Sequence, residues 1–434
     1  MQSYTPRFAV SPENVLSELR QNMLVDGFEH ILDMERSHGA YLVEQRTGKA
    51  YLDFFTCIAS MPIGMNHPRM TDPAFVEFLG RIALHKPSNS DIYNVHQATF
   101  DKTFRELAIS EHFRYAFFID GGTLAVENAL KAAFDWKVQK NFAKGHLTEK
   151  GHSIIHFERA FHGRSGYALS LTNTDPSKTK FFPQFNWPRI TPPIMSFPAT
   201  DEVLQRVIEA EAHAVAQMKQ AFIEDPDNIA AIIIEPIQGE GGDNHFRPEF
   251  FRALRELADE NDCLLIFDEV QTGVGLTGTM WAHEGIGVKP DIMAFGKKMQ
   301  VCGIVASERL SEIEDNVFVT SSRINSTWGG SLVDMVRATK YLEIIDDENL
   351  VQNAATQGAY LQERIAHLEN ARGRGLFCAF DMPTPEARGA VLKGAYEKGL
   401  ILVGCGTRSV RLRPPLNITR AQIDDAVAII ECVV

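Results

Sequence analysis

Two stretches decide the fold of this chain: LLIFDEVQ at residues 264–271 and PDIMAFGKKM at residues 290–299. In each, an apolar run leads directly into charged residues, which is typical of a buried strand that ends at a site. The first run ends at Asp268, and the second leads through Gly296 to the neighbouring amines Lys297 and Lys298. Since ligands bind at the carboxyl ends of strands in open α/β sheets, both ends are expected to face one crevice.

Short apolar runs and longer amphipathic stretches alternate from about residue 113 to 305. This alternation predicts an α/β fold, a mainly parallel central sheet with helices on its faces. The predicted strands are 115–119, 153–157, 231–234, 264–267 and 292–295. The clearest helix is expected over residues 201–222, after Thr200 as its N-cap, because apolar residues recur there at helical spacing.

The two ends of the chain differ from this central part. Residues 337–345 and 353–368 have helical patterns, whereas 375–382 and 410–412 have the pattern of strands. We therefore expect a large α/β domain over residues 76–329. Residues 1–75 and 330–434 are expected to form one smaller α+β domain together.

Composition excludes several classes of partner. The net charge of −13, without any basic block, argues against nucleic acid, which requires a concentrated basic face. The six scattered cysteines form no Cys-x-x-Cys pair, which favours reduced thiols and a cytoplasmic location. Neither a signal peptide nor a membrane span is expected, because the longest clean apolar run near the middle covers only residues 229–234.

An amine and a carboxylate at neighbouring strand ends are the groups that pyridoxal phosphate chemistry requires. The amine holds the aldehyde of the cofactor as a Schiff base, and the carboxylate keeps its pyridine nitrogen protonated. Asp268 suits the second task, and either Lys297 or Lys298 suits the first, since the local pattern does not choose between them. Taken alone, Asp268 is equally consistent with a helix cap or an ion-pair partner.

Two further clusters have residues suited to the same chemistry. FFIDGGT at 117–123 leads from a strand through two glycines into a helix, which predicts an anion site at a helix N-terminus. An ordinary turn between strand and helix is about equally consistent with this pattern. Phe161 could stack on a cofactor ring, and Arg164 could bind a carboxylate in bidentate fashion. His162 is interpreted as a packed or hydrogen-bonding residue. No metal is expected, since His152 and His156 lie on a predicted strand, too far apart to share one.

In their order along the chain, these clusters resemble the class III (ω-amino acid) aminotransferases, which are pyridoxal-phosphate-dependent transferases of fold type I. The resemblance covers nearly the whole chain, from YLDF at 51–54 and GMNHP at 64–68 to RLRPP at 411–415. It implies that Lys297 is the Schiff-base lysine, that Asp268 pairs with the ring nitrogen and that Gln271 reaches the ring hydroxyl. It also implies a homodimer with active sites at the interface. The other implied cofactor contacts are Phe161 and Val270 at the ring, with Gly122, Thr123 and the neighbouring subunit's Thr327 at the phosphate.

Details of the sequence resemble the L-lysine 6-aminotransferase branch, notably RINSTWGG at 323–330 and FHGRSGY at 161–167. This branch implies transfer of the ε-amino group of L-lysine to 2-oxoglutarate in a ping-pong cycle. Glu240 would neutralise Arg411 while lysine binds, Arg164 would hold the distant carboxylate, and Asn325 would contact the substrate. The alternatives are a 4-aminobutyrate or ornithine-type ω-aminotransferase, a fold type I decarboxylase or racemase, and a non-catalytic cofactor-binding protein.

Overall fold

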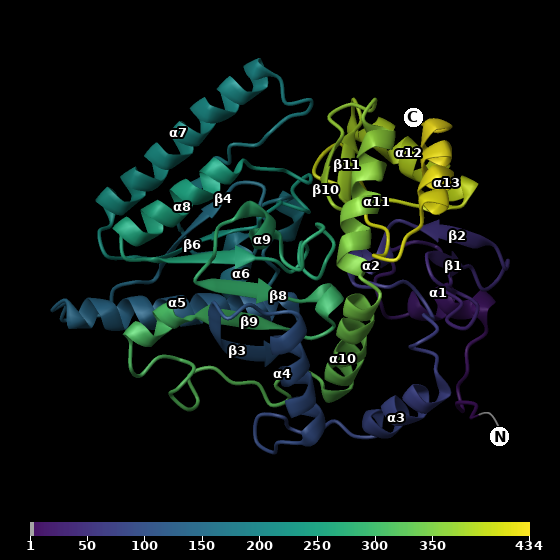
Figure 1. Cartoon of the computed structure of the whole chain (residues 1–434), viewed down its shortest axis with the longest axis horizontal. Coiled ribbons are helices and arrows are strands. Elements are labelled where there is room, and N and C mark those ends of the chain that lie inside the picture. The colour runs from purple at the N-terminus through teal and green to yellow at the C-terminus, as the bar shows by residue number, and fades with distance from the viewer. Residues whose placement is uncertain (1–3) are drawn as a thin grey trace.

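A seven-stranded sheet lies at the centre of the computed structural model, which describes residues 4–434 (Figure 1). The strand order is β3-β9-β8-β7-β6-β4-β5, and the five strands from β8 to β5 run parallel. Strand β9 runs antiparallel to both of its neighbours, β3 and β8. The strands are β3 (Phe113–Ile119), β4 (Ser153–Phe157), β5 (Arg189–Ile190), β6 (Ile229–Ile234), β7 (Leu264–Asp268), β8 (Ile292–Phe295) and β9 (Cys302–Ser307). The mainly parallel α/β sheet predicted from the sequence is therefore confirmed.

Helices cover both faces of this sheet. Helix α5 (Gly122–Ala143) lies on one face, and α7 (Asp201–Glu224) and α8 (Pro248–Glu260) lie on the other (Figure 1). Successive strand residues point to opposite faces, so Ile233 packs in the cluster with α5 and Ile232 in the cluster with α7 and α8. This burial on two sides explains why the strands read as continuous apolar runs. Helix α7 begins after Thr200, whose hydroxyl accepts the N–H of Val203, as predicted.

Both ends of the chain meet in two smaller sheets beside the large one. Strand β12 (Leu400–Ile401) pairs in parallel with β2 (Ala50–Asp53), which pairs with β1 (Tyr41–Val43). The second small sheet is antiparallel and joins, in order, β10 (Arg372–Arg374), β11 (Phe377–Asp381), β14 (Ser409–Leu412) and β13 (Val403–Cys405). Helices α11 (Leu350–Ile365), α12 (Pro385–Lys398) and α13 (Arg420–Glu431) lie beside these sheets (Figure 1). The smaller α+β part made from both termini is confirmed, while its boundaries near residues 75 and 330 stay a prediction.

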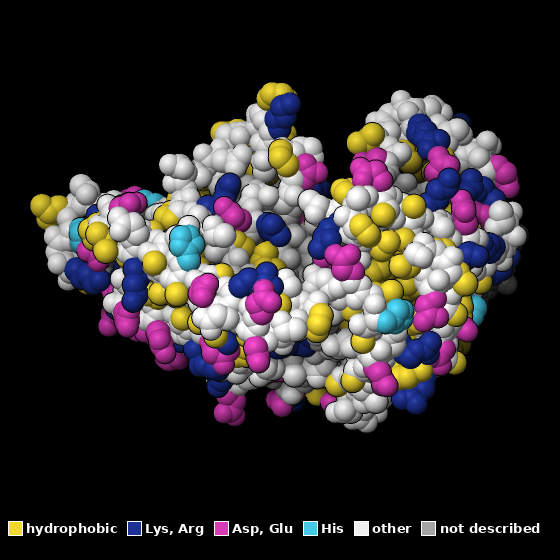
Figure 2. Space-filling model, turned by 90° about the horizontal axis from the view of Figure 1, so that it is seen from above, with side chains coloured by type: hydrophobic (Ala, Val, Ile, Leu, Met, Phe, Trp, Pro, Cys, Tyr) yellow, Lys and Arg dark blue, Asp and Glu magenta, His cyan; other side chains and the backbone are white. Residues whose placement is uncertain are grey.

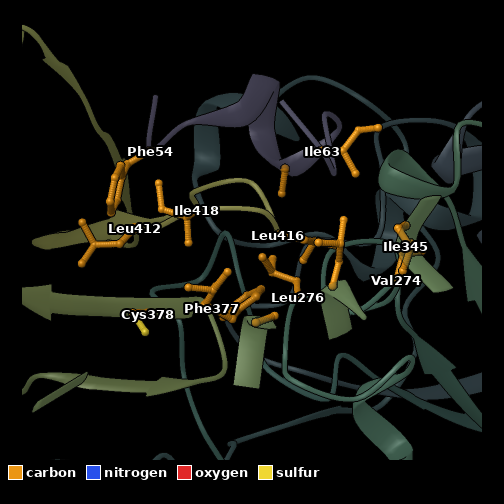
Figure 3. Packing of buried hydrophobic residues seen from close by; sticks show 14 of the residues in the cluster. Phe54, Ile63, Val274, Leu276, Ile345, Phe377, Cys378, Leu412, Leu416 and Ile418 are labelled. Carbon is orange, nitrogen blue, oxygen red and sulfur yellow. The ribbon is translucent and has the colours of Figure 1, made fainter. Parts of the chain in front are cut away.

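One hydrophobic cluster ties this smaller part to the rest of the molecule. Figure 3 shows Phe54 and Ile63 from the N-terminal part and Leu412 from β14 in the same cluster as Val274 and Leu276, which follow β7. Helices α3 (Pro73–Ala83), α4 (Val95–Leu107) and α10 (Leu332–Asp347) pack together next to it. The strand ends of the large sheet and the two chain termini therefore share one core, which fixes their relative positions.

The remaining helices are short, and one of them is left-handed. They are α1 (Val15–Leu19), α2 (Thr56–Ala59), α6 (Gly166–Leu171), α9 (Ala282–Ile286) and the 3-10 turns η1 (Pro12–Asn14), η2 (Pro176–Lys178), η3 (Lys297–Met299) and η4 (Glu308–Glu312). In α2 the φ angle is 44° at Thr56, 52° at Cys57, 57° at Ile58 and 58° at Ala59. A left-handed residue that is not glycine costs about 1–2 kcal/mol, so other groups must hold this turn in place.

The surface is mixed in charge. Acidic and basic side chains are interspersed over the face shown in Figure 2. No helix within residues 4–434 combines the length and the apolar character needed to cross a membrane.

Candidate active site

The carboxyl ends of five strands converge on one cavity of about 580 Å³. Strand β7 ends at Asp268, β8 leads to Lys297, β3 leads to the start of α5, and β4 and β6 lead to the segments at Phe161 and Glu235. Eight predicted site residues line this cavity, namely Gly122, Thr123, Phe161, Arg164, Asp268, Val270, Gln271 and Lys297. The expectation that the strand ends share a crevice is confirmed.

The N-terminus of α5 forms one corner of the cavity. The helix begins at Gly122, and its N–H groups in the first turn have no partners within the helix. A side chain at Gly122 would place its Cβ 3.0 Å from a methyl group of Val270, so only glycine leaves this corner open. The hydroxyl of Thr123 accepts the N–H of Arg164 at 3.2 Å. The 22 residues of α5 direct their positive helix end here, which suits a phosphate group.

A buried carboxylate lies deep in the cavity. Oδ2 of Asp268 is 2.8 Å from Nδ1 of His162, and Oδ1 accepts the N–H of Val270 at 3.1 Å. His162 is thus a hydrogen-bonding residue, as interpreted from the sequence. Glu235 lies beside this pair, and burial, opposed by His162 and reinforced by Asp268, raises its pKa to about 7. The carboxylate of Glu235 accepts the N–H of Phe161 at 2.9 Å, which fixes the backbone under that ring.

The structure separates the two neighbouring lysines. Lys297 lines the cavity, and burial together with the positive charge of Arg411 lowers its pKa to about 8. Lys298 points elsewhere and donates to the carbonyl of Gln271 at 2.7 Å. A side chain at Gly296 would meet Sγ of Cys302 at 2.7 Å, so a glycine is needed before the lysine pair. Only Lys297 of the two presents an amine to the cavity.

A second polar group lies next to the cavity, around Glu240. Its Oε2 is 2.5 Å from Arg411 and its Oε1 is 2.8 Å from Lys178, so two cations hold one carboxylate. Burial opposes ionisation of Glu240, yet Arg411 and Lys178 lower its pKa below the ordinary value. Arg411 also lies 3.5 Å from Oε1 of Gln271, which lines the cavity. The pair is therefore within reach of a ligand at Lys297.

Not every predicted residue reaches the cavity. Asn325 and Thr327 are exposed on the segment before α10, where the Thr327 carbonyl accepts from Ser88 at 2.7 Å. Arg164 is exposed at the cavity edge, with its guanidinium 5.9 Å from the centre of the Phe161 ring. The roles predicted for Asn325 and Thr327 stay predictions.

Sequence reasoning missed several residues of the cavity wall, namely Ser60, Gln300 and Cys302, together with Lys178 at Glu240. Ser60 follows the left-handed turn α2, for which the sequence carries no signal. Sequence reasoning also gave no role to Glu235, although it follows a buried strand directly, the same signal that singled out Asp268. Applied to β6, that signal would have placed Glu235 in the site.

Comparison with known proteins places this site in a class and then in a family. The fold and the cavity define a pyridoxal-phosphate-dependent transferase of fold type I. A solved lysine aminotransferase from Mycobacterium tuberculosis superimposes with a TM-score of 0.96 at 49% identity, covering 98% of this chain and 99% of that one. Residues 25–434 match the family model "Aminotransferase class-III", and the chain belongs to that family.

Curated relatives agree over nearly the full length. An L-lysine-epsilon aminotransferase from Mycobacterium tuberculosis is 51% identical over 427 residues, which cover 96% of this chain and 94% of the relative. The enzyme of that name from Streptomyces clavuligerus is 47% identical over 424 residues, covering 95% and 92%. Human mitochondrial 4-aminobutyrate aminotransferase is 30% identical over 441 residues, covering 93% and 85%. The family resemblance drawn from the sequence is confirmed.

The residues present fit pyridoxal 5'-phosphate, the cofactor of this family. The glycine corner at Gly122 leaves room that a Cβ would fill, and the helix N-terminus there suits the phosphate. The carboxylate of Asp268 and the amine of Lys297 face the same cavity, as the ring nitrogen and the aldehyde require. When bound, the cofactor supplies an electron sink that stabilises a carbanion next to the transferred nitrogen.

Proposed function

We propose that this chain transfers the ε-amino group of L-lysine to 2-oxoglutarate, giving 2-aminoadipate 6-semialdehyde and L-glutamate in a ping-pong cycle. The masking of Arg411 by Glu240 carries this proposal. Arg411 is 3% exposed and paired at 2.5 Å, so a donor with a bare CH₂–NH₂ group meets no unpaired cation there. The names of the relatives at 47–51% identity support lysine as that donor.

Lys297 has two tasks in this proposal. It would hold the cofactor covalently between turnovers and would be freed when the amine of the donor takes its place. Freed Lys297 then acts as the general base that removes a proton from C6 of lysine. In the second half-reaction the same amine returns a proton to C2 of the 2-oxoglutarate skeleton. Its lowered pKa of about 8 keeps a useful fraction neutral near pH 7.

The other cavity residues orient the cofactor. Asp268 would pair with the ring nitrogen, held in place by the hydrogen bond from His162. Gln271 would contact the ring hydroxyl. Phe161 and Val270 would sandwich the ring. Gly122 and Thr123 would contact the phosphate.

Glu240 and Arg411 would allow one site to accept two different substrates. While lysine reacts, the carboxylate neutralises the guanidinium. When 2-oxoglutarate binds, its α-carboxylate takes the place of Glu240, exchanging one ion pair for another at little net cost. Arg164, exposed at the cavity edge, would hold the distant carboxylate of either substrate, and Asn325 is proposed as a further substrate contact.

Glu240→Ala should slow the lysine half-reaction about 10- to 100-fold, while the half-reaction with 2-oxoglutarate changes little. The reason is that Arg411 would then face the uncharged CH₂ of the donor without a partner. Single-turnover kinetics of each half-reaction measure the two effects separately. Glu209→Ala, at an exposed position on α7, is the matched control. Equal losses in both half-reactions would refute the exchange.

Capture of the cofactor by apoprotein should follow the ionisation of Lys297. Since only the neutral amine attacks the aldehyde and the pKa of Lys297 is about 8, its neutral fraction rises roughly tenfold between pH 7 and pH 9. The capture rate, followed as growth of the yellow absorbance, should rise in this range and level off above it. A rate that keeps rising to pH 10.5, as for an ordinary lysine, would contradict the lowered pKa.

A panel of amino donors tests the substrate assignment. L-Lysine, L-ornithine and 4-aminobutyrate are each incubated with 2-oxoglutarate, and the products are identified by mass. We expect the highest kcat/KM for lysine, with the loss of the ε-nitrogen. Preference for 4-aminobutyrate would assign the chain to the 4-aminobutyrate aminotransferase branch. The chain is 30% identical to the human enzyme of that branch. Release of CO₂, or turnover without 2-oxoglutarate, would indicate a decarboxylase or a racemase.

We further propose a homodimer with its active sites at the interface and a cytoplasmic location. Large apolar side chains are exposed near the cavity and on the segments around α3, among them Leu84, Ile92, Tyr93, Leu124 and Trp328. Such a surface is typical of a protein–protein contact. Thr327, adjacent to Trp328, would reach the phosphate of the second subunit. The six cysteines are all free thiols, which supports the cytoplasmic location.

A further inference from the structure

Lys298 is a buried amine that the reaction above does not use. It is 2% exposed, and its Nζ lies 2.7 Å from the carbonyl oxygen of Gln271 and 3.4 Å from that of Ala59. Within the described part of the chain, residues 4–434, it forms no ion pair with a carboxylate. A buried ammonium without a counter-charge is costly, so the charge state of this amine needs an explanation.

The surroundings of Lys298 favour the neutral form. Three charged groups face it: Lys297 on its own turn, Arg413 after β14 and Glu269 after β7. Two of these share its sign, and Glu269 is already bonded to His283 at 3.0 Å. Burial, joined by Lys297, lowers the pKa of Lys298 well below the ordinary value. An ammonium has three N–H groups and a neutral amine two, so two carbonyl acceptors match the neutral amine.

The amine connects two parts of the cavity wall. Its Ala59 contact is the last residue of the left-handed turn α2, which holds an unfavourable backbone conformation only because its surroundings fix it. Asp53 accepts the N–H of Thr56 at 2.7 Å at the start of the turn. At its end, Gln300 donates to the carbonyl of Ser60 at 2.8 Å, and both residues line the cavity.

We propose that Lys298 is a positioning residue that works as an uncharged amine, fastening the left-handed turn α2 to the backbone at Gln271 and thereby fixing the cavity wall at Ser60. The two adjacent lysines then divide two tasks. Lys297 reacts, and Lys298 aligns the wall along which the amino donor reaches it. The proposal holds for any amino donor, so it stands independently of lysine as the substrate.

The charge state is tested by the stability of the holoenzyme. In the unfolded chain this lysine has its ordinary pKa near 10.4, so between the lowered folded pKa and that value the unfolded state binds one more proton. Stability of the wild type relative to Lys298→Met must therefore rise with pH in this window. Between pH 7 and pH 9 we expect the melting temperature of the wild type, relative to that of the variant, to rise by about 1–2 °C per pH unit.

Lys393→Met is the matched control, because that lysine lies on α12 with a side chain that is 80% exposed. Its difference from the wild type should not change between the two pH values. If the difference in melting temperature between the wild type and Lys298→Met also does not change with pH, Lys298 is charged in the folded state. That result would overturn the proposal. If Lys298→Met does not fold, Lys298→Gln replaces it, since its amide is neutral and does not titrate.

The positioning role is tested by kinetics of the half-reactions with the same variant. Because Lys298→Met frees the turn that carries Ser60, we expect KM for the amino donor to rise about tenfold, with kcat changed less than about threefold. Lys298→Gln keeps N–H donors and should restore part of the lost affinity. Unchanged kinetics, or equal losses of kcat in both half-reactions, would overturn the positioning role.

Discussion

Lys297→Ala should lower kcat by about 10⁴-fold or more, because one side chain supplies both the covalent attachment and the proton transfer. Among the described residues, the amine of Lys178 also lies near the cavity, but the carboxylate of Glu240 holds it at 2.8 Å. Arg164 and Arg411 carry guanidinium groups rather than amines, and Lys298 donates to the Gln271 carbonyl at 2.7 Å. Steady-state assays with lysine and 2-oxoglutarate, and single turnovers of each half-reaction, measure the loss.

The attachment point is checked independently of turnover. Borohydride reduction of the wild-type holoenzyme, followed by peptide mapping, should place the adduct on Lys297, and Lys297→Ala should give none. A small amine added to Lys297→Ala should restore part of the proton transfer, because it can occupy the space of the lost side chain. Retained activity, or an adduct at Lys298, would contradict the assignment and would reverse the two lysine roles.

The strand ends were predictable because one physical rule places them. Strands β7 and β8 are buried on both sides, so their apolar runs end where the chain reaches the edge of the sheet, at Asp268 and Lys297. The same rule located the turn before Gly122. The antiparallel strand β9 was not predicted. It begins with Cys302 and Gly303, directly after the lysine turn, and its apolar run, residues 304–306, is too short to give a clear strand signal.

The cavity wall was less predictable, because it depends on contacts between distant segments. Four consecutive left-handed residues in α2 contradict the local preferences of Thr56 and Ile58. A distant contact helps to hold them, because the hydroxyl of Thr56 donates to the carbonyl of Arg413 at 2.8 Å. Lys178 reaches Glu240 from 62 positions away, on a segment that reads as an ordinary loop. The choice between Lys297 and Lys298 required the family resemblance. The structure gives its physical basis, because Lys297 lines the cavity whereas the amine of Lys298 donates to the carbonyl of Gln271.

Asp268→Asn should reduce kcat by about 10²- to 10³-fold while the protein stays folded. The amide has nearly the shape of the carboxylate and can still accept the N–H of Val270, now made at 3.1 Å. It carries no negative charge, so it cannot hold a proton on the ring nitrogen, and the electron sink that stabilises the developing carbanion weakens. The loss should appear in both half-reactions, since both pass through the same proton transfer at Lys297.

Asp291→Asn is the control for burial alone, because Asp291 is also a buried aspartate of this sheet but lies at the opposite end of β8. Its oxygens contact Arg255 at 2.9 Å and the N–H of Leu265 at 2.7 Å, far from the cavity lining. It should lose stability without a comparable loss of kcat. The kinetic effect of Asp268→Asn would thereby be separated from a folding defect. A loss of kcat below about threefold for Asp268→Asn would show that the charge of this carboxylate is not used.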